Sequence, residues 1–234
     1  MIPPVICISG IDTDIGKSVA TGLLARYLLS RGQQVITQKL VQTGCSGLAE
    51  DLLTHRRIMG LEPCEEDRQG LTCPYVFETP CSPHLAAELA GKVIDPAVLS
   101  HSTQILAARY ETVLVEGAGG LLVPLTREVT LLDYLEQQGW PLVLVSSPRL
   151  GSINHTLAAL ELAHGRGLRV LGIVYNRFRE GDPRIVVDSA RVFRQALRGH
   201  GFPDCVIDLF GLDAYDSSDT HPEFGGLFLT EGRK

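Results

Sequence analysis

The segment GIDTDIGKS at residues 10–18 constrains the fold of this chain more than any other feature. It fits the pattern G-x-x-x-x-G-K-[ST], and it lies between an apolar run over residues 5–9 and an amphipathic pattern over residues 17–30. Glycines let a backbone wrap closely around phosphate oxygens, and the free amides at the start of a helix point toward them. The pattern therefore predicts a phosphate-binding loop between a strand and a helix.

Lys17 and Ser18 close this loop and carry its chemistry. The lysine is expected to neutralise the β- and γ-phosphates of a nucleotide, and the serine hydroxyl is expected to hold Mg²⁺. ATP as co-substrate and Mg²⁺ as cofactor are therefore the predicted ligands. The loop alone is equally compatible with a molecular switch, a transporter motor or a kinase, so other segments must distinguish these functions.

Short apolar runs alternate with longer amphipathic segments through the rest of the chain. Further strands are predicted over residues 34–38, 112–115, 142–146, 170–175 and 205–209. Further helices are predicted to start near Asp95 and near Gly151, and to span residues 182–198. Runs that are apolar at nearly every position are typical of strands buried on both faces of a parallel sheet. The alternation predicts an α/β fold: a doubly wound, mostly parallel sheet flanked by helices, similar to P-loop NTPases.

The chain contains no internal repeat and no low-complexity linker, which predicts a single P-loop α/β domain over residues 1–234. Residues 64–83 are rich in proline and show little periodicity, so they are expected to form an extended excursion over the sheet edge. Residues 213–234 are acidic and contain many glycines and serines. They are expected to form a poorly ordered tail.

The composition excludes several classes of partner. Lys and Arg are scattered and the net charge is −6, whereas nucleic-acid-binding proteins carry a clustered basic face. No apolar run approaches the roughly 20 residues that span a bilayer, and the N-terminus lacks the features of a signal peptide. We therefore expect a cytoplasmic protein without a nucleic-acid or membrane partner. The cysteines form no CxxC pair and are expected to be free thiols, with a metal or redox role for Cys64, Cys73 and Cys81 as the alternative.

Polar residues also lie at the ends of two other predicted strands. Glu116 ends one strand and begins a glycine-rich turn, and ligands of open α/β sheets collect at such carboxyl ends. It is predicted to reach the Mg²⁺ held by Ser18. Asp51 is a candidate for a further oxygen ligand or for an ordinary helix N-cap. Lys39 follows another strand and is a candidate for stabilising a transferring phosphoryl group, or for a solvated surface lysine.

Six segments resemble the dethiobiotin synthetase family, in its order and spacing, from about residue 5 to residue 178. They are residues 10–18 (GIDTDIGKS), 39–44 (KLVQTG), 82–87 (SPHLAA), 115–120 (VEGAGG), 150–155 (LGSINH) and 172–176 (GIVYN). The resemblance implies an ATP-dependent ligase that closes the cyclic urea of dethiobiotin from 7,8-diaminopelargonic acid and CO₂. The reaction proceeds in that family through a phosphorylated carbamate and yields ADP and phosphate.

The resemblance also implies site residues. Lys17 and Lys39 would stabilise the carbamate and the phosphoryl group, and Mg²⁺ would be held by Ser18, Asp51 and Glu116. ATP would contact Asp14, Ile15, Gly16, Lys17, Ser18, Val19, Asp51, Glu116, Gly117, Ala118, Gly119 and, through its adenine, Asn176. The diamine would contact Thr13 and Thr43. Its carboxylate would bind at a helix N-terminus of the partner subunit in a homodimer, formed by Gly151, Ser152, Ile153 and Asn154.

Two alternatives remain. The first is a paralogous P-loop ATPase or ligase acting on another small substrate, because Leu40 stands where the family usually has proline and residues 207–211 (IDLFG) replace a Gly-x-Ile-Pro pattern. The same stretch leaves the nucleotide-base preference open. The second is a regulatory partitioning-type ATPase, although such proteins carry a lysine where this chain has Ile11. An amidotransferase-linked synthetase would need a glutaminase domain, for which 234 residues leave no room.

Overall fold

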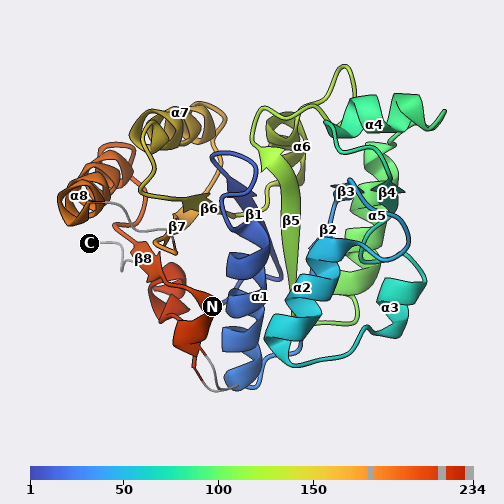
Figure 1. Cartoon of the computed structure of the whole chain (residues 1–234), viewed down its shortest axis with the longest axis horizontal. Helices are drawn as coiled ribbons and strands as arrows, with labels where there is room; N and C mark the ends of the chain where they lie inside the picture. The colour runs from blue at the N-terminus through green and yellow to red at the C-terminus, as the bar shows by residue number, and fades with distance from the viewer. Residues whose placement is uncertain (179–181, 216–219, 230–234) are drawn as a thin grey trace.

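The computed structural model describes residues 1–178, 182–215 and 220–229. Its centre is a six-stranded sheet in the order β2-β5-β1-β6-β7-β8, in which all neighbouring strands are parallel (Figure 1). The strands are β1 (Val5–Gly10), β2 (Val35–Lys39), β5 (Thr112–Gly120), β6 (Leu142–Ser146), β7 (Val170–Asn176) and β8 (Val206–Leu209). Most residues of these strands are buried because helices cover both faces of the sheet. The predicted fold class is confirmed.

Two hydrophobic cores lie on opposite faces of this sheet. One face is covered by α1 (Lys17–Ser30) and α2 (Glu50–Met59). The other is covered by α5 (Pro96–Ala107), α6 (Leu131–Gln138), α7 (Ser152–Gly165) and α8 (Pro183–Gly199). The chain leaves β1 toward β2 on one side and returns through β5 to β6 on the other, so the strand order reverses at β1. Ligands of such sheets bind at the carboxyl end of the strand where the order reverses.

A small second sheet lies beside the first and consists of β3 (Val41–Thr43) and β4 (Tyr75–Phe77). The short helices α3 (Glu65–Arg68) and α4 (Pro83–Leu89) lie on either side of β4 along the chain. The prediction of an extended excursion over residues 64–83 is therefore wrong in part, because this segment contains both α3 and β4. Three-residue strands are too short for a periodicity signal, so their pairing could not be seen in the sequence.

The C-terminal region also differs from the expectation. The described residues include the 3₁₀ helices η1 (Leu212–Tyr215) and η2 (Phe224–Phe228). Phe224 and Leu227 are buried in the core over α1, and the Phe224 ring meets Tyr27 edge-on at 5.8 Å. The predicted poorly ordered tail is therefore wrong for the described residues 220–229, because two apolar side chains anchor this stretch. Residues 216–219 and 230–234, which the same prediction covers, lie outside the described residues.

Candidate nucleotide and metal site

The phosphate-binding loop joins β1 to α1, as its pattern predicts. Gly16 immediately precedes the helix with φ +95°, a conformation that favours glycine. A Cβ atom there would also collide with the amide nitrogen of Asn176. That amide donates to the carbonyl oxygen of Ile15 at 2.9 Å, while its oxygen accepts from the backbone N–H of Phe178 at 3.1 Å. The end of β7 therefore holds the loop directly against its glycine.

Lys17 begins α1 and is only 6% exposed. Its ammonium group donates to the backbone oxygen of Asp12 at 2.8 Å, so the lysine side chain lies inside the loop. Burial and the nearby charge of Lys39 lower the pKa of Lys17 to about 8, with carboxylates of the site opposing this effect. An anionic phosphate beside Lys17 would oppose that shift by favouring the charged ammonium, which makes Lys17 a ready partner for a bound triphosphate.

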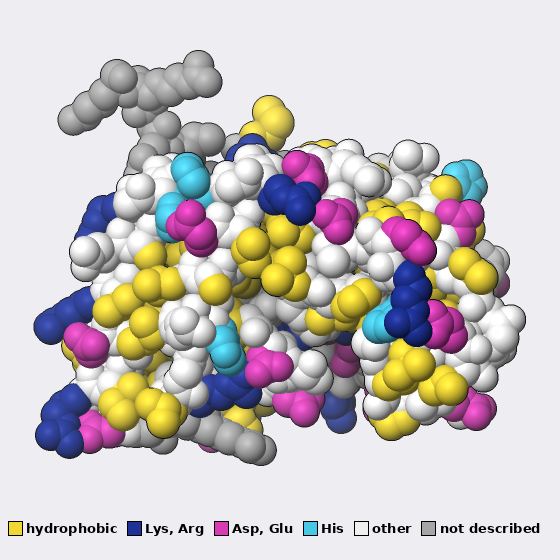
Figure 2. Space-filling model, turned by 90° about the horizontal axis from the view of Figure 1, so that it is seen from above, with side chains coloured by type: hydrophobic (Ala, Val, Ile, Leu, Met, Phe, Trp, Pro, Cys, Tyr) yellow, Lys and Arg dark blue, Asp and Glu magenta, His cyan; other side chains and the backbone are white. Residues whose placement is uncertain are grey.

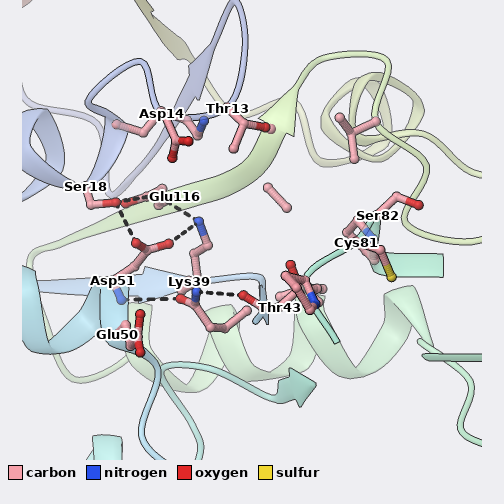
Figure 3. A pocket seen from close by; sticks show the side chains of 18 of the residues that line it. Thr13, Asp14, Ser18, Lys39, Thr43, Glu50, Asp51, Cys81, Ser82 and Glu116 are labelled. Atoms are coloured by element: carbon pink, nitrogen blue, oxygen red, sulfur yellow. Dashed lines mark hydrogen bonds and ion pairs between the residues drawn. The ribbon is translucent and has the colours of Figure 1, made fainter. Parts of the chain in front are cut away.

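Four charged or polar side chains converge next to the loop from four different elements (Figure 3). Ser18 on α1 donates its hydroxyl to Oδ1 of Asp51 at 2.8 Å and to Oε1 of Glu116 at 3.1 Å. Lys39, at the end of β2, lies 2.6 Å from Oδ2 of Asp51 and 2.8 Å from Oε1 of Glu116. The Lys39 ammonium also donates to the carbonyl oxygen of Gly117 at 3.2 Å. Its three hydrogens therefore all have acceptors.

This geometry excludes the alternative of a solvated Lys39. The alternative of Asp51 as an ordinary N-cap is wrong, because the N-cap of α2 is Ala49 and Asp51 lies within the helix. Lys39 is 5% exposed and Glu116 is fully buried. Burial opposes charge on both groups, but their attraction prevails: the charges of Glu116 and Asp51 hold the pKa of Lys39 above its usual range. In turn, Lys39 and a hydrogen bond from His55 hold the pKa of Glu116 well below its usual range. Both groups are therefore charged at neutral pH.

His55 is a site residue that the sequence did not indicate. It is fully buried on α2, one turn after Asp51, and its Nε2 lies 2.7 Å from Oε2 of Glu116. The i, i+4 spacing places both side chains on the same face of α2, which was the available signal. A histidine inside an amphipathic helix is otherwise unremarkable, and its contact depends on the packing of α2 against the sheet.

The donor set suits Mg²⁺. In the part of the chain that the structure describes, no group of three or more His, Cys, Asp and Glu side chains is arranged to hold a metal ion. The candidate donors are instead one hydroxyl and two carboxylates, from Ser18, Asp51 and Glu116. Mg²⁺ prefers oxygen ligands and is commonly bound through one or two carboxylates together with substrate phosphates. The six cysteines are free thiols, as expected, and among the described residues none of them belongs to a cluster that could hold a metal ion.

Two cavities open on either side of the loop. The larger, of about 840 Å³, contains the charged cluster and reaches Thr13, Thr43 and Cys81. The smaller, of about 620 Å³, lies between the loop and the ends of β7 and β8. Asp14, Gly16 and Val19 line both cavities, so the loop forms the wall between them. Figure 2 looks down on this edge of the sheet, where acidic and basic side chains lie in the recessed middle of the face.

The predicted contacts divide between these cavities. The larger is lined by Thr13, Lys17, Ser18, Lys39, Thr43, Asp51, Glu116, Ala118 and Gly119, together with the shared loop residues. The smaller is lined by Ile15 and Asn176, and by Phe178, Phe210 and Gly211, which the sequence had not assigned. Gly117 enters only through its carbonyl oxygen, which accepts from Lys39. The smaller cavity therefore combines polar loop atoms with two aromatic rings.

One predicted group does not join the site within a single chain. Gly151, Ser152, Ile153 and Asn154 form the N-terminus of α7, and none of them lines either cavity. Gly151 adopts φ +92°, and among the described residues no side chain caps this helix. Ser152 is buried, whereas Asn154 and the preceding Leu150 are exposed. The expected carboxylate site across a dimer stays a prediction.

The parallel sheet, the loop after β1 and the carboxylates beside it define a P-loop protein that binds a nucleoside triphosphate. A family profile described as an AAA domain matches residues 5–200. A solved structure of a ParA family ATPase from Chlorobium tepidum has the same fold, with a TM-score of 0.53 and 18% identity. The match covers 92% of this chain and 86% of that one, and at this identity it concerns the fold alone.

Sequence comparison narrows this class. An ATP-dependent dethiobiotin synthetase, BioD 2 of Haemophilus influenzae, is 54% identical over 78% of this chain and 95% of the relative. The ATP-dependent dethiobiotin synthetase BioD of Chlorobaculum tepidum is 52% identical over 88% of this chain and 86% of the relative. This chain belongs to the dethiobiotin synthetase family, which confirms the resemblance seen in its motifs.

Proposed function

We propose that this chain is an ATP-dependent carbon–nitrogen ligase that closes the cyclic urea of dethiobiotin from 7,8-diaminopelargonic acid and CO₂. The proposal combines the family membership with one observation: a buried ammonium, that of Lys39, lies between two carboxylates where the phosphate loop meets a cavity of about 840 Å³. In this reaction ATP phosphorylates a carbamate, and the second amine displaces phosphate. Catalysis by positioning and charge neutralisation suits such a site.

The triphosphate is proposed to lie along the loop, with Lys17 beside the β- and γ-phosphates. Ser18, Asp51 and Glu116 would hold Mg²⁺, because the Ser18 hydroxyl already lies within hydrogen-bond distance of both carboxylates. Mg²⁺ held by these residues would neutralise negative charge on the phosphates. Adenine is proposed to occupy the smaller cavity, with Asn176 as hydrogen-bonding partner and the rings of Phe178 and Phe210 as apolar walls.

Lys39 is proposed to stabilise negative charge on the carbamate and on the transferring phosphoryl group. Its pKa lies above the usual range, so it acts as a fixed positive charge and not as a base. Because its three hydrogens already have acceptors, contact with substrate requires the exchange of at least one of them. Thr13 and Thr43 line the same cavity and are proposed to contact the diamine or its carbamate.

We further propose a homodimer in which the N-terminus of α7 from the partner subunit receives the substrate carboxylate. Free backbone amides and the helix dipole favour an anion at such a site. Within each subunit we propose one P-loop domain, because both hydrophobic cores pack on the same sheet. No helix among the described residues is long and apolar enough to span a membrane. A cytoplasmic location, without nucleic-acid or membrane partners, is part of the same proposal.

A second candidate is a paralogous ligase that retains this nucleotide site but acts on another small substrate. It is favoured by Leu40, which is fully buried behind the site, and by Phe210 in the smaller cavity, since both positions depart from the family pattern. A regulatory partitioning-type ATPase is disfavoured because Ile11 replaces the lysine expected in that class.

The test is to incubate the protein with 7,8-diaminopelargonic acid, bicarbonate, Mg²⁺ and ATP, and to detect dethiobiotin by mass spectrometry. Dethiobiotin formation that requires all four additions supports the ligase. If ATP binds in the presence of Mg²⁺ but no dethiobiotin forms, the ligase proposal fails and the paralogue is favoured. Analytical ultracentrifugation of the same sample tests the dimer separately.

A further inference from the structure

His55 is fully buried and contacts the charged cluster through Glu116, yet the proposed reaction assigns it no role. Glu116 offers two oxygens. Its Oε1 faces the cavity, where it accepts from Ser18 and from Lys39, whereas its Oε2 is turned away and meets Nε2 of His55 at 2.7 Å. Each oxygen thus has its own set of partners, and the His55 contact selects which oxygen faces the ligand.

The tautomer of His55 follows from what surrounds it. Oε2 of the ionised Glu116 can only accept a hydrogen bond, so Nε2 of His55 must carry the hydrogen. No described residue is hydrogen-bonded to Nδ1, which is buried. The hydrogen-bonding capacity of the ring is therefore directed, through Nε2, at Glu116 alone.

Helix α2 is itself held in place, so His55 is a rigid support. The next residue, Arg56, forms a buried bidentate ion pair with Asp67, at 2.8 Å from Nε to Oδ2 and 2.7 Å from Nη2 to Oδ1. Its Nη1 also donates to the hydroxyl of Thr37 on β2 at 2.8 Å. These contacts tie α2 to both β2 and α3. The position of the His55 ring is therefore determined by the sheet and not by the ligand.

We propose that His55 is a positioning residue that orients Glu116, through its outer oxygen, to receive the metal–nucleotide complex. A partner behind a ligating side chain fixes its rotamer and its ionised state, and losing such a partner typically weakens metal affinity by roughly 10- to 100-fold. Without His55, Glu116 is free to turn Oε2 toward Lys39. The inference rests on the proposed metal site but not on the identity of the substrate.

The variants His55→Leu and His55→Gln separate the hydrogen bond from the volume of the side chain. Leucine removes the donor, whereas glutamine can place an N–H close to the position of Nε2. Ile58→Val, on the same helix and also buried, serves as the matched control because Ile58 packs against Gly22 and has no contact with the cluster. Thermal unfolding of all three variants shows whether each one folds.

Binding of a non-hydrolysable ATP analogue is then measured by calorimetry at increasing Mg²⁺ concentrations and in excess chelator. We expect His55→Leu to raise the Mg²⁺ concentration needed for half-maximal enhancement of binding by about tenfold or more. Binding in chelator should stay unchanged, and His55→Gln and Ile58→Val should behave like the unmodified protein.

Three results would overturn the proposal, two from the variants and one from the unmodified protein. One is an unchanged Mg²⁺ requirement in His55→Leu, and the other is an equal loss in His55→Leu and His55→Gln, which would assign the effect to packing. An unmodified protein whose analogue binding ignores Mg²⁺ would overturn the metal site along with the role of His55. Absence of dethiobiotin formation, by contrast, would leave the calorimetric result standing and remove only the proposed substrate.

Discussion

The two cavities beside the phosphate loop differ in how they are built. The larger contains a closed network of buried charges, in which Lys39, Asp51 and Glu116 are joined by bonds of 2.6 to 2.8 Å. The smaller is walled by Leu209, Phe210 and other apolar side chains at the ends of β7 and β8. Charges removed from water are tolerated only when they are paired. Each charged side chain of the larger cavity therefore depends on its neighbours to remain charged and buried.

This difference predicts unequal responses to substitution. A change in the charged cavity leaves a buried charge without its partner and is expected to be costly. A change in the apolar cavity removes contact area from a partly exposed wall, and the remaining residues of that wall still contact the proposed base. The largest effects are therefore expected at the charged cavity and its support, and the smallest in the apolar cavity.

The largest effect is expected at the support of the charged cavity, in the variant Asp67→Asn. The buried Arg56–Asp67 pair fixes α2, and breaking such a pair by removing one charge typically costs about 3–5 kcal/mol. Chemical denaturation at neutral pH should show this loss in the free energy of unfolding. Glu65→Gln is the control, because its ion pair with Arg68 is exposed and contributes little. Equal stability of the two variants would contradict a supporting role for this pair.

The loss of stability in Asp67→Asn is expected to depend on pH. Burial raises the pKa of Asp67, but hydrogen bonds from Arg56 and Thr72 outweigh it and bring the pKa down to about 2, from an ordinary 3.8. The folded state therefore favours the ionised form of Asp67. The stability that this ionised carboxylate contributes is complete above pH about 4 and is lost as the pH falls toward about 2. The stability gap between the unmodified protein and Asp67→Asn should therefore close over that interval. A gap that stays constant would exclude ionisation of Asp67 as its source.

The next effect is expected at Lys39. Lys39→Met keeps much of the volume but removes the charge, and loss of one group that stabilises transition-state charge lowers kcat by roughly 10²–10³. Single-turnover formation of dethiobiotin measures this directly. Affinity for ATP should change less, because Lys17 and the loop amides remain. The exposed Lys92→Met controls for loss of a positive charge, and a loss of ATP affinity as large as the loss of rate would assign Lys39 to binding instead.

The sequence predicted the charged cavity far better than the apolar one, for a physical reason. Glu116 follows an apolar run and Lys39 follows a predicted strand, and parallel strands bring their carboxyl ends to one edge of the sheet. Residues at these strand ends lie close together regardless of the conformation of the loops between the strands. Phe178 and Phe210 line one cavity only because β7 and β8 are neighbours with a particular register, in which Asn176 pairs with Leu209.

Other features that the sequence did not predict also depend on how distant segments pack together. The pairing of β3 with β4 joins two three-residue segments that are more than 30 positions apart, so no local pattern encodes it. His55 reads as a polar residue of an amphipathic helix until α2 is packed against β2 and β5. The anchoring of Phe224 and Leu227 over α1 was hidden by the acidic composition around them. In each case the missing information was a contact between distant segments.

The smallest effect is expected in the apolar cavity, in the variant Phe210→Ala. Phe210 is 41% exposed, and the guanidinium of Arg177 lies 5.0 Å from its ring centroid, which holds the ring at the cavity mouth. Contact between an aromatic ring and a base is worth about 1 kcal/mol, so the KM for ATP should rise by roughly three- to tenfold with kcat unchanged. The similarly exposed Val187→Ala, on α8 outside both cavities, should leave both constants unaltered.

Inorganic triphosphate sharpens this last comparison, because it carries the phosphates of ATP without a base. As a competitive inhibitor it should bind Phe210→Ala and the unmodified protein equally, whereas Lys17→Met should weaken it strongly. The preference for ATP over CTP should also shrink in Phe210→Ala, since a smaller wall discriminates less between bases. If triphosphate inhibition weakens along with ATP binding, Phe210 acts on the loop and not on the base, and the two cavities are not separable in the way their walls indicate.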